Sequence, residues 1–479
     1  MTGVHPHDAA ALTSLRHIGA EPANWVPARD GIDHDVAIIG GGQCGLSIAF
    51  ALRQAGIGNT VLIDANEASL PGIWLTKARM HTLRTVKELA GPELFNPALG
   101  FQAWYEASHG QQAYEDLVRI PRTEWAQYLL WFRHIVGIDA RSSTRVDRIE
   151  PVGSHFRLHL SSNGVGSAIT VRRVVLATGY PGGGKPAIPG FIEAGLPKSH
   201  YAHTDEDIDF SKFVGKTVGI LGAASAAFDN AATALEAGAA TVRLFCRHPD
   251  LQRQSAGRAA NYIGVSENFY ELDDATRWQF APVIRGRGIH PTPAVVARAA
   301  RFPNFRIHLD AAWKGVRLVD DRIEVQLDGR QVVIDHALVA TGYAIDAAFR
   351  PELSDFARHI EVWADRPGLP AIPNATTTGR FPYLGPSFEY REREPGAAPY
   401  LSHIYAPNFS ALVSFARHVG DVPSLKAAIP RLVRGISRSL FVEDRDLHIQ
   451  RMSSWQGEEL SAESYAHAIE PEPRFEAAE

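Results

Sequence analysis

The sequence of 479 residues predicts an α/β fold with two Rossmann-like dinucleotide-binding domains. The first observation is a unit of strand, glycine-rich turn, helix and strand over residues 35–64, and the second is a similar unit over residues 216–247. The third is a pair of apolar runs, residues 174–180 and 335–343, which both end in Ala-Thr-Gly-Tyr. A chain of this length has room for two or three domains, so both units can belong to separate domains.

The composition is that of a globular protein, with 45% apolar and 21% charged residues. A net charge of -5 gives no reason to expect nucleic acid or an anionic membrane as a partner. There is no apolar run of about 18 residues and no secretory-signal layout at the N-terminus. The two cysteines, Cys44 and Cys246, form no Cys-x-x-Cys pair, which argues against dithiol chemistry and a zinc site. We therefore expect a cytoplasmic protein without a metal, a nucleic-acid partner or a membrane partner.

The first unit begins with an apolar run over residues 35–39 that is rich in β-branched residues. A helical pattern follows the glycine-rich turn and ends before Gly56. A second strand is predicted over residues 60–63 and is followed directly by Asp64.

The turn itself carries the spacing of a dinucleotide-binding site, Gly40-x-Gly42-x-x-Gly45. The first glycine lets the chain turn, the second lets the backbone approach a pyrophosphate, and the third lets the helix pack on the strand. Free N–H groups at the helix start then face the phosphates. Asp64 stands where an acidic residue accepts hydrogen bonds from a ribose. We predict that Gly40, Gly42, Gln43, Gly45 and Asp64 bind FAD.

The second unit is looser than the first. A strand over residues 216–221 leads into the turn Gly222-x-Ala224-x-x-Ala227, a helix is predicted over residues 229–237, and the next strand ends at Arg247. Alanine in the second place keeps a pyrophosphate slightly further from the backbone. A cation after the second strand suits a 2′-phosphate, so Arg247 predicts NADPH, with Arg243 as the weaker candidate. A nucleotide-like fold that no longer binds a nucleotide is the alternative.

Two such units in one chain imply two dinucleotides that meet between the domains. FAD takes the first unit and NADPH the second, so a hydride passes from the nicotinamide to the flavin.

Other segments give weaker signals. Residues 1–33 are interpreted as an N-terminal extension, and the tail from residue 453 is acidic and without apolar periodicity. The stretch 71–135 is rich in aromatic residues, most of which we expect in the core, with a helix over residues 122–135. Strands are expected within residues 143–176.

The chain resembles the class B flavin-dependent monooxygenases, which include flavin-containing monooxygenases, Baeyer–Villiger enzymes and N-hydroxylating enzymes. The resemblance covers roughly residues 34–450. The motifs that carry it are Gly40-x-Gly42-x-x-Gly45, Pro71-Gly-Ile-Trp74, Ala177-Thr-Gly179, the Gly222 turn with Ser225, and Asp335 to Tyr343.

This resemblance implies an NADPH domain inserted in the FAD domain. The expected limits are 34–200 and 336–452 for the two parts of the FAD domain, 201–335 for the NADPH domain and 453–479 for the tail. The resemblance also implies further cofactor-binding residues: Trp74 along the flavin, Val146 at the adenine, Ser225 in the second turn, and Thr178, Thr341 and Gly342 in the linkers between the domains.

The activity implied is insertion of one oxygen atom from O₂ into a small organic substrate by a C4a-hydroperoxyflavin, while bound NADP⁺ excludes water. The match of Asp335 to Tyr343 with N-hydroxylating members favours N- or S-oxygenation over Baeyer–Villiger oxygenation. The alternatives are an NADPH-dependent flavin oxidoreductase and a flavin-binding sensor. The substrate is not identified, and the oligomeric state, a homo-oligomer included, is left open.

Two departures from the family pattern define the candidate catalytic residues. His203 stands where the family has a histidine, but Asp207 replaces the aromatic residue expected four positions later. Arg84 lies where many members have an asparagine, and a guanidinium could stabilise a peroxide anion there. Alternatively, His203 is a hydrogen-bonded loop residue and Arg84 is a salt-bridged structural residue.

Overall fold

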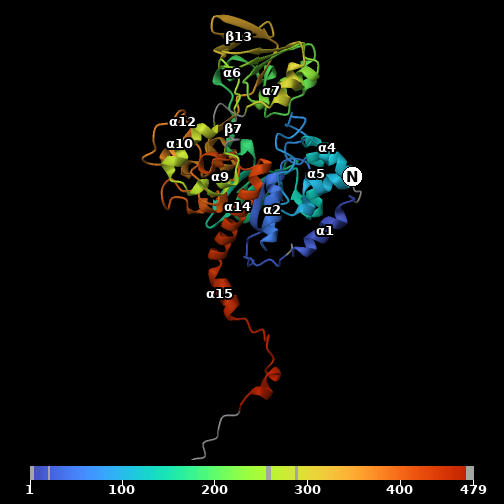
Figure 1. Ribbon diagram of the computed structural model, residues 1–479. Helices are drawn as coiled ribbons and strands as arrows, with labels where there is room; N and C mark the ends of the chain where they lie inside the picture. The colour runs from blue at the N-terminus through green and yellow to red at the C-terminus, as the bar shows by residue number, and fades with distance from the viewer. Residues whose placement is uncertain (1–4, 20–21, 255–259, 286–289, 471–479) are drawn as a thin grey trace, which may run out of the picture.

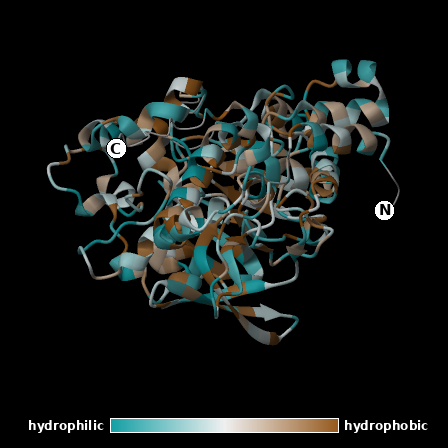
Figure 2. Ribbon diagram, turned by 90° about the horizontal axis from the view of Figure 1, so that it is seen from below, coloured by the Kyte–Doolittle hydropathy of each residue, from teal (hydrophilic) through white to brown (hydrophobic). Residues whose placement is uncertain are grey.

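The computed structural model describes residues 5–19, 22–254, 260–285 and 290–470. The chain forms a large lower body and a smaller upper domain, joined near β7 (Figure 1). Seen from below, hydrophobic and hydrophilic residues alternate along the helices and strands (Figure 2). No helix in the described ranges is long and apolar enough to cross a membrane.

The lower body is built on a seven-stranded sheet of order β3-β2-β1-β6-β5-β4, with β17 also pairing with β6. Strands β1, β2, β3, β6 and β17 are parallel, whereas β5 pairs antiparallel with β6 and β4 pairs antiparallel with β5. The bounds are β1 His34–Ile39, β2 Thr60–Ile63, β3 Ala140–Arg141, β4 Arg145–Val152, β5 His155–Ser162, β6 Val165–Leu176 and β17 Ile404–Tyr405.

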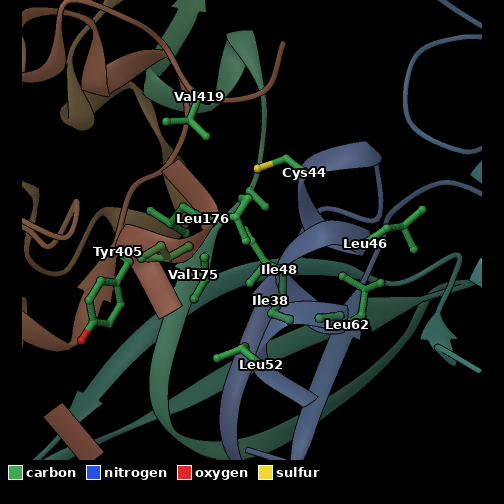
Figure 3. Close-up of a cluster of buried hydrophobic side chains, with 14 of the residues drawn as sticks. Ile38, Cys44, Leu46, Ile48, Leu52, Leu62, Val175, Leu176, Tyr405 and Val419 are labelled. Atoms are coloured by element: carbon green, nitrogen blue, oxygen red, sulfur yellow. The ribbon is translucent and has the colours of Figure 1, made fainter. Parts of the chain in front are cut away.

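Helices α2 (Gln43–Gln54) and α14 (Val422–Glu443) pack against each other beside this sheet. Figure 3 shows the apolar side chains of α2, such as Ile48 and Leu52, among those of β1 and β6. The aromatic helices α3 (Phe101–His109), α4 (Gln111–Asp116) and α5 (Arg122–Ile135) and the N-terminal α1 (Asp8–His17) lie beside α2 (Figure 1).

The upper domain has a parallel sheet of order β11-β10-β9-β15-β8. Helices α7 (Ser225–Glu236) and α11 (Pro293–Ala300) pack together, and their buried side chains share a cluster with those of the sheet. An antiparallel sheet of β12, β13 and β14 and the short helix α6 (Gly190–Gly195) complete the domain. The strand bounds are β8 Tyr201–His203, β9 Thr217–Leu221, β10 Thr241–Phe245, β11 Phe305–His308, β12 Gly315–Val319, β13 Arg322–Leu327, β14 Arg330–Ile334 and β15 His336–Val339.

The mixed, mainly parallel first sheet and the parallel second sheet confirm the predicted fold class, and β15 extends the second sheet beyond the boundary expected at residue 335. Two linkers join the domains, β7 (Gly184–Pro186) and β16 (Tyr343–Ile345), which pair antiparallel. The second domain is therefore inserted in the first.

One excursion leaves the upper domain and packs on the lower body. Helices α9 (Ile263–Asn268) and α10 (Asp274–Arg285) contact α14 and α13 (Leu412–Phe415), respectively. The indole rings of Trp278 and Trp363 stack with centroids 5.9 Å apart. The short α12 (Ala375–Thr378) lies in the same region, whereas α15 (Arg445–Ser453) and the residues after it extend away from the body (Figure 1).

A buried ion cluster fixes the end of α14 to the sheet. The Arg172 side chain, 2% exposed, pairs with Asp35 of β1 at 3.3 Å and with Asp444 at 2.8 Å. Glu443 pairs with Arg172 and Arg173 at 3.1 and 2.6 Å. Buried charges paired in this way specify where the helix ends against the sheet.

Candidate cofactor sites

In the first glycine turn, Gly40 and Gly45 are required by the protein's own geometry. Gly40 has a φ of +111°, and a Cβ there would lie 2.4 Å from the carbonyl oxygen of Ala177. A Cβ on Gly45 would lie 1.8 Å from the carbonyl oxygen of Gly40, because helix α2 packs closely on its strand. Any side chain at either position would break the turn.

Gly42 differs because the space in front of it is open. The nearest atom to a Cβ there is the Cα of Gly72, at 3.6 Å. Gly42 is also the N-cap of α2 and provides no side-chain cap, so the first N–H groups of the helix keep their hydrogen-bonding capacity. An open approach to free N–H groups at a helix N-terminus fits the pyrophosphate of FAD.

Asp64 stands at the end of β2 and organises the turn. One carboxylate oxygen accepts the N–H of Gly41, and the other accepts the N–H of Asn66 at 2.7 Å. Burial raises the pKa of the Asp64 carboxyl, although these hydrogen bonds oppose the shift. Thr144 donates its N–H to the Asp64 carbonyl at 2.9 Å, so the segment leading to the buried Val146 runs beside the end of β2. The adenine contact of Val146 stays a prediction.

Gln43 has a role that the turn motif does not reveal. Its amide oxygen accepts the indole N–H of Trp125 at 2.9 Å, and its amide nitrogen donates to the carbonyl of Gly420 at 2.5 Å. The side chain thus ties α2 to α5 and to the loop before α14. The N-terminus of α14 consequently lies beside that of α2.

Trp74 and Thr178 lie near the same turn. The Trp74 ring is half-buried and meets Trp125 edge-on, with centroids 6.4 Å apart. The buried Asn408 donates to the Leu176 carbonyl at 3.1 Å and to the Thr178 hydroxyl at 3.5 Å. The end of β6 is thereby fixed next to the glycine turn.

The second turn repeats the geometry of the first. Gly222 has a φ of +123°, and a Cβ there would lie 2.5 Å from the Ala340 carbonyl oxygen. Ala224 is the N-cap of α7 and gives no side-chain cap, so this helix also begins with free N–H groups. The Ser225 hydroxyl, by contrast, donates to the His290 carbonyl at 3.0 Å and is already engaged.

Arg247 follows β10 and is exposed. Its Nε lies 3.4 Å from the His248 ring, and within the described part of the chain it has no carboxylate partner. A free cation at the end of the second strand fits a 2′-phosphate.

The second Ala-Thr-Gly segment joins the two linkers. The Thr341 hydroxyl donates to the Ala187 carbonyl, and the Ala187 N–H donates to the Gly342 carbonyl at 2.9 Å. Thr341 and Gly342 therefore hold β16 against the segment after β7, where the chain passes between the domains.

The structure places the two candidate catalytic residues at the domain boundary. His203 is a buried residue of β8 whose Nδ1 accepts the Asp205 N–H at 3.1 Å. Burial lowers the pKa of His203, and the charge of Asp205 opposes this shift. The imidazole is therefore neutral at pH 7. The Arg84 guanidinium pairs with the buried carboxylate of Asp229 on α7. Arg84 is thus salt-bridged across the boundary, the alternative that the sequence left open.

A polar cluster that sequence analysis missed lies between the linkers. The Tyr180 hydroxyl is 2.7 Å from Nε2 of His418, and its ring stacks on Tyr343 at 6.1 Å. Burial lowers the pKa of His418, with Asp421 opposing the shift. Asp421 caps α14 by accepting the Ser424 N–H at 3.0 Å. The repeated tyrosine after Ala-Thr-Gly was a signal for this cluster, whereas nothing in the sequence pointed to His418.

Comparison with known proteins agrees with this geometry. Residues 34–264 match the pyridine nucleotide-disulphide oxidoreductase family. The chain is 38% identical over 445 residues to the FAD-dependent urate hydroxylase of Xanthomonas campestris pv. campestris, covering 92% of this chain and 93% of that protein.

Two solved structures share the fold at low identity. The ornithine hydroxylase of Pseudomonas aeruginosa has a TM-score of 0.64 at 16% identity and covers 86% of this chain and 99% of its own. The L-lysine 6-monooxygenase of Pseudomonas syringae has a TM-score of 0.63 at 19% identity and covers 85% and 99%.

Identity of 38% across nearly the whole length establishes family membership, and the predicted class of enzyme is confirmed. The chain belongs to the family of flavin-dependent monooxygenases that includes the FAD-dependent urate hydroxylase of Xanthomonas.

Proposed function

We propose that the chain uses NADPH, FAD and O₂ to hydroxylate a small nitrogen-rich heterocycle of the urate class. The observation that carries the proposal is the pair of glycine turns, each leading into a helix N-terminus without a side-chain cap. The full-length likeness to a urate hydroxylase supports the choice of substrate. The likeness to amine hydroxylases is one of fold alone and does not favour an amine.

Bound FAD supplies the electron transfer and the activation of oxygen. The residues of the first turn hold its pyrophosphate, Asp64 meets its ribose, and Arg247 holds the 2′-phosphate of NADPH. The packed rings of Tyr180, Tyr343 and Phe409 exclude water between the linkers. The neutral His418 imidazole and the Tyr180 hydroxyl form a hydrogen bond of 2.7 Å.

A disulfide reductase is a weaker candidate, although residues 34–264 match a family named for pyridine nucleotide-disulphide oxidoreductases. The only two cysteines, Cys44 and Cys246, are both buried. Burial raises the pKa of the Cys44 thiol to about 12, which suppresses the thiolate. No thiol pair supports exchange with a disulfide substrate.

The test measures NADPH oxidation, oxygen uptake and urate loss with the purified flavoprotein. We expect urate to accelerate NADPH oxidation by about tenfold or more, which corresponds to roughly 1.4 kcal/mol in the barrier. One NADPH and one O₂ should be used for each urate, with one oxygen atom in the product and the other in water.

Two comparisons separate the alternatives. L-Ornithine and L-lysine should leave the rate of NADPH oxidation unchanged. NADPH should reduce the flavin in the absence of air. If all of its electrons then appear as hydrogen peroxide when air and urate are added, this would contradict oxygen insertion into urate. Flavin that NADPH does not reduce at all would contradict NADPH dependence.

A further inference from the structure

The C-terminal arm, residues 449–470, comprises the end of α15 and the chain that follows it, extends away from the body (Figure 1) and is exposed at every position. It carries large apolar side chains that contact water: Met452 is 66% exposed, Trp455 72% and Leu460 67%. Ile449, Tyr465 and Ile469 are exposed as well. Such a concentration of exposed apolar side chains marks an interaction segment rather than an ordinary surface.

A hollow of about 510 Å³ on the body shares the aromatic character of this arm. It is lined by Trp25, Arg434, Ser437, Arg438, Phe441 and His448. The Phe441 and His448 rings stack with centroids 4.4 Å apart, and Trp25 meets Phe441 edge-on at 6.1 Å. Aromatic side chains such as Trp455 pack well on a floor of this kind.

The charges of the arm and the hollow are complementary. Arg434 and Arg438 are exposed one helical turn apart on α14, and neither has a carboxylate partner within the described residues. The sequence from 452 to 470 contains no lysine or arginine. It contains four glutamates: Glu458, Glu459, Glu463 and Glu470. An acidic segment with aromatic side chains therefore fits an aromatic hollow with a basic rim.

The direction of α15 favours the hollow of another molecule. His448 in this helix lines the chain's own hollow, and the following residues lead away from it (Figure 1). From residue 454 to 470 the chain can span about 55 Å when extended, enough to reach a neighbouring body. A two-fold axis would let each molecule place its arm in the hollow of the other.

We propose that the protein forms a two-fold homodimer by exchanging C-terminal arms, with the acidic aromatic arm of each chain in the α14 hollow of its partner. Full-length protein should have the mass of a dimer by light scattering at about 10 μM, a concentration typical of modest interfaces. A chain that stops after Ser453 should be a monomer with unchanged flavin content and NADPH oxidation.

Charge reversal distinguishes exchange from other modes of association. The arm variant E458R/E459R and the hollow variant R434E/R438E should each be monomeric, because each chain has arm and hollow of like charge. Mixed in equal amounts, they should form a heterodimer, since both arm–hollow pairs then have opposite charges. A chain with all four substitutions should dimerise with itself.

Three results would overturn the proposal. A monomeric full-length protein would mean that the arm binds its own body or another molecule. A chain truncated after Ser453 that is still dimeric would place the interface elsewhere. A mixture of the two charge-reversal variants that stays monomeric would show that the arm and the hollow do not meet between chains.

Discussion

Gly42 is the glycine of the first turn at which a side chain would affect the ligand rather than the turn. A Cβ there meets only the Cα of Gly72, at 3.6 Å. We expect Gly42→Val to fold and to contain roughly a tenth or less of the wild-type flavin, because the branched side chain occupies the approach to α2. Flavin absorbance per protein measures this.

Gly166→Val provides the matched control. Gly166 lies in β6 with open space around its Cβ position and without a left-handed conformation, so its flavin content should be that of the wild type. A wild-type flavin content in the Gly42 variant would show that the turn is not part of the FAD site.

Arg247 is the residue expected to distinguish NADPH from NADH. It is exposed after β10 without a carboxylate partner in the described ranges. A hydrogen bond to a charged group contributes about 1.5–3 kcal/mol, so Arg247→Ala should raise the KM for NADPH by roughly 10–100-fold and leave that for NADH nearly unchanged. Arg243→Ala, in the same strand, should show no such preference. Equal effects of the Arg247 variant on both nucleotides would assign the 2′-phosphate to another residue.

Spacing alone predicted the conformationally constrained residues of both turns. Gly40 and Gly222 adopt positive φ, and Asp64 ends the second strand, because these constraints act within a short stretch of chain. The role of Gln43 was not predictable in this way. Its partners, Trp125 and Gly420, are distant in sequence, and nothing in the local pattern reports such a contact.

At the scale of the element, α14 depends on a glycine where it passes the loop containing Ser387. A Cβ on Gly435 would lie 2.2 Å from the Ser387 Cβ. Overpacking of this kind costs about 1–3 kcal/mol, whereas alanine gains about 1 kcal/mol in helix propensity. We expect Gly435→Ala to lower the midpoint of thermal unfolding by roughly 2–4 °C, measured by circular dichroism.

Ser387→Gly supplies the companion variant. Combined with Gly435→Ala, it removes the atoms that clash and should restore most of the lost stability. A double variant that is no more stable than Gly435→Ala would refute steric conflict with Ser387 as the cause.

Helices with a clear apolar period were predicted well, and others less so. The aromatic spacing gave residues 122–135, which are the bounds of α5. Helix α7 was expected from residue 229 but begins at Ser225, because the small residues Ala226 and Ala227 show no periodicity. The packing of α10 on the lower body depends on the distant Trp363 and lay beyond any local pattern.

At the scale of the whole molecule, the two domains have separate apolar cores and are joined by paired linkers. Polar contacts from the segment 77–84 cross the boundary: Lys77 pairs with Asp205 at 3.5 Å, Arg84 pairs with Asp229, and Arg298 donates to the Arg79 carbonyl at 2.8 Å. Interfaces between domains of one chain are commonly polar and permit relative motion. The orientation of the two cofactor sites therefore depends in part on these polar contacts.

The Arg84–Asp229 pair tests this dependence. Burial raises the pKa of Asp229, and Arg84, together with Arg298 at 3.9 Å, opposes that shift. Removing Arg84 or Asp229 therefore breaks the ion pair that crosses the boundary. We expect Arg84→Ala and Asp229→Ala each to slow flavin reduction by NADPH about tenfold, with a double variant no slower than the singles, as for coupled residues. Stopped-flow absorbance of the flavin measures these rates. Lys198→Ala, which breaks the exposed pair with Glu206, should leave them unchanged. If Arg84 instead acted on oxygen directly, its variant alone would release more hydrogen peroxide per NADPH while the Asp229 variant would not.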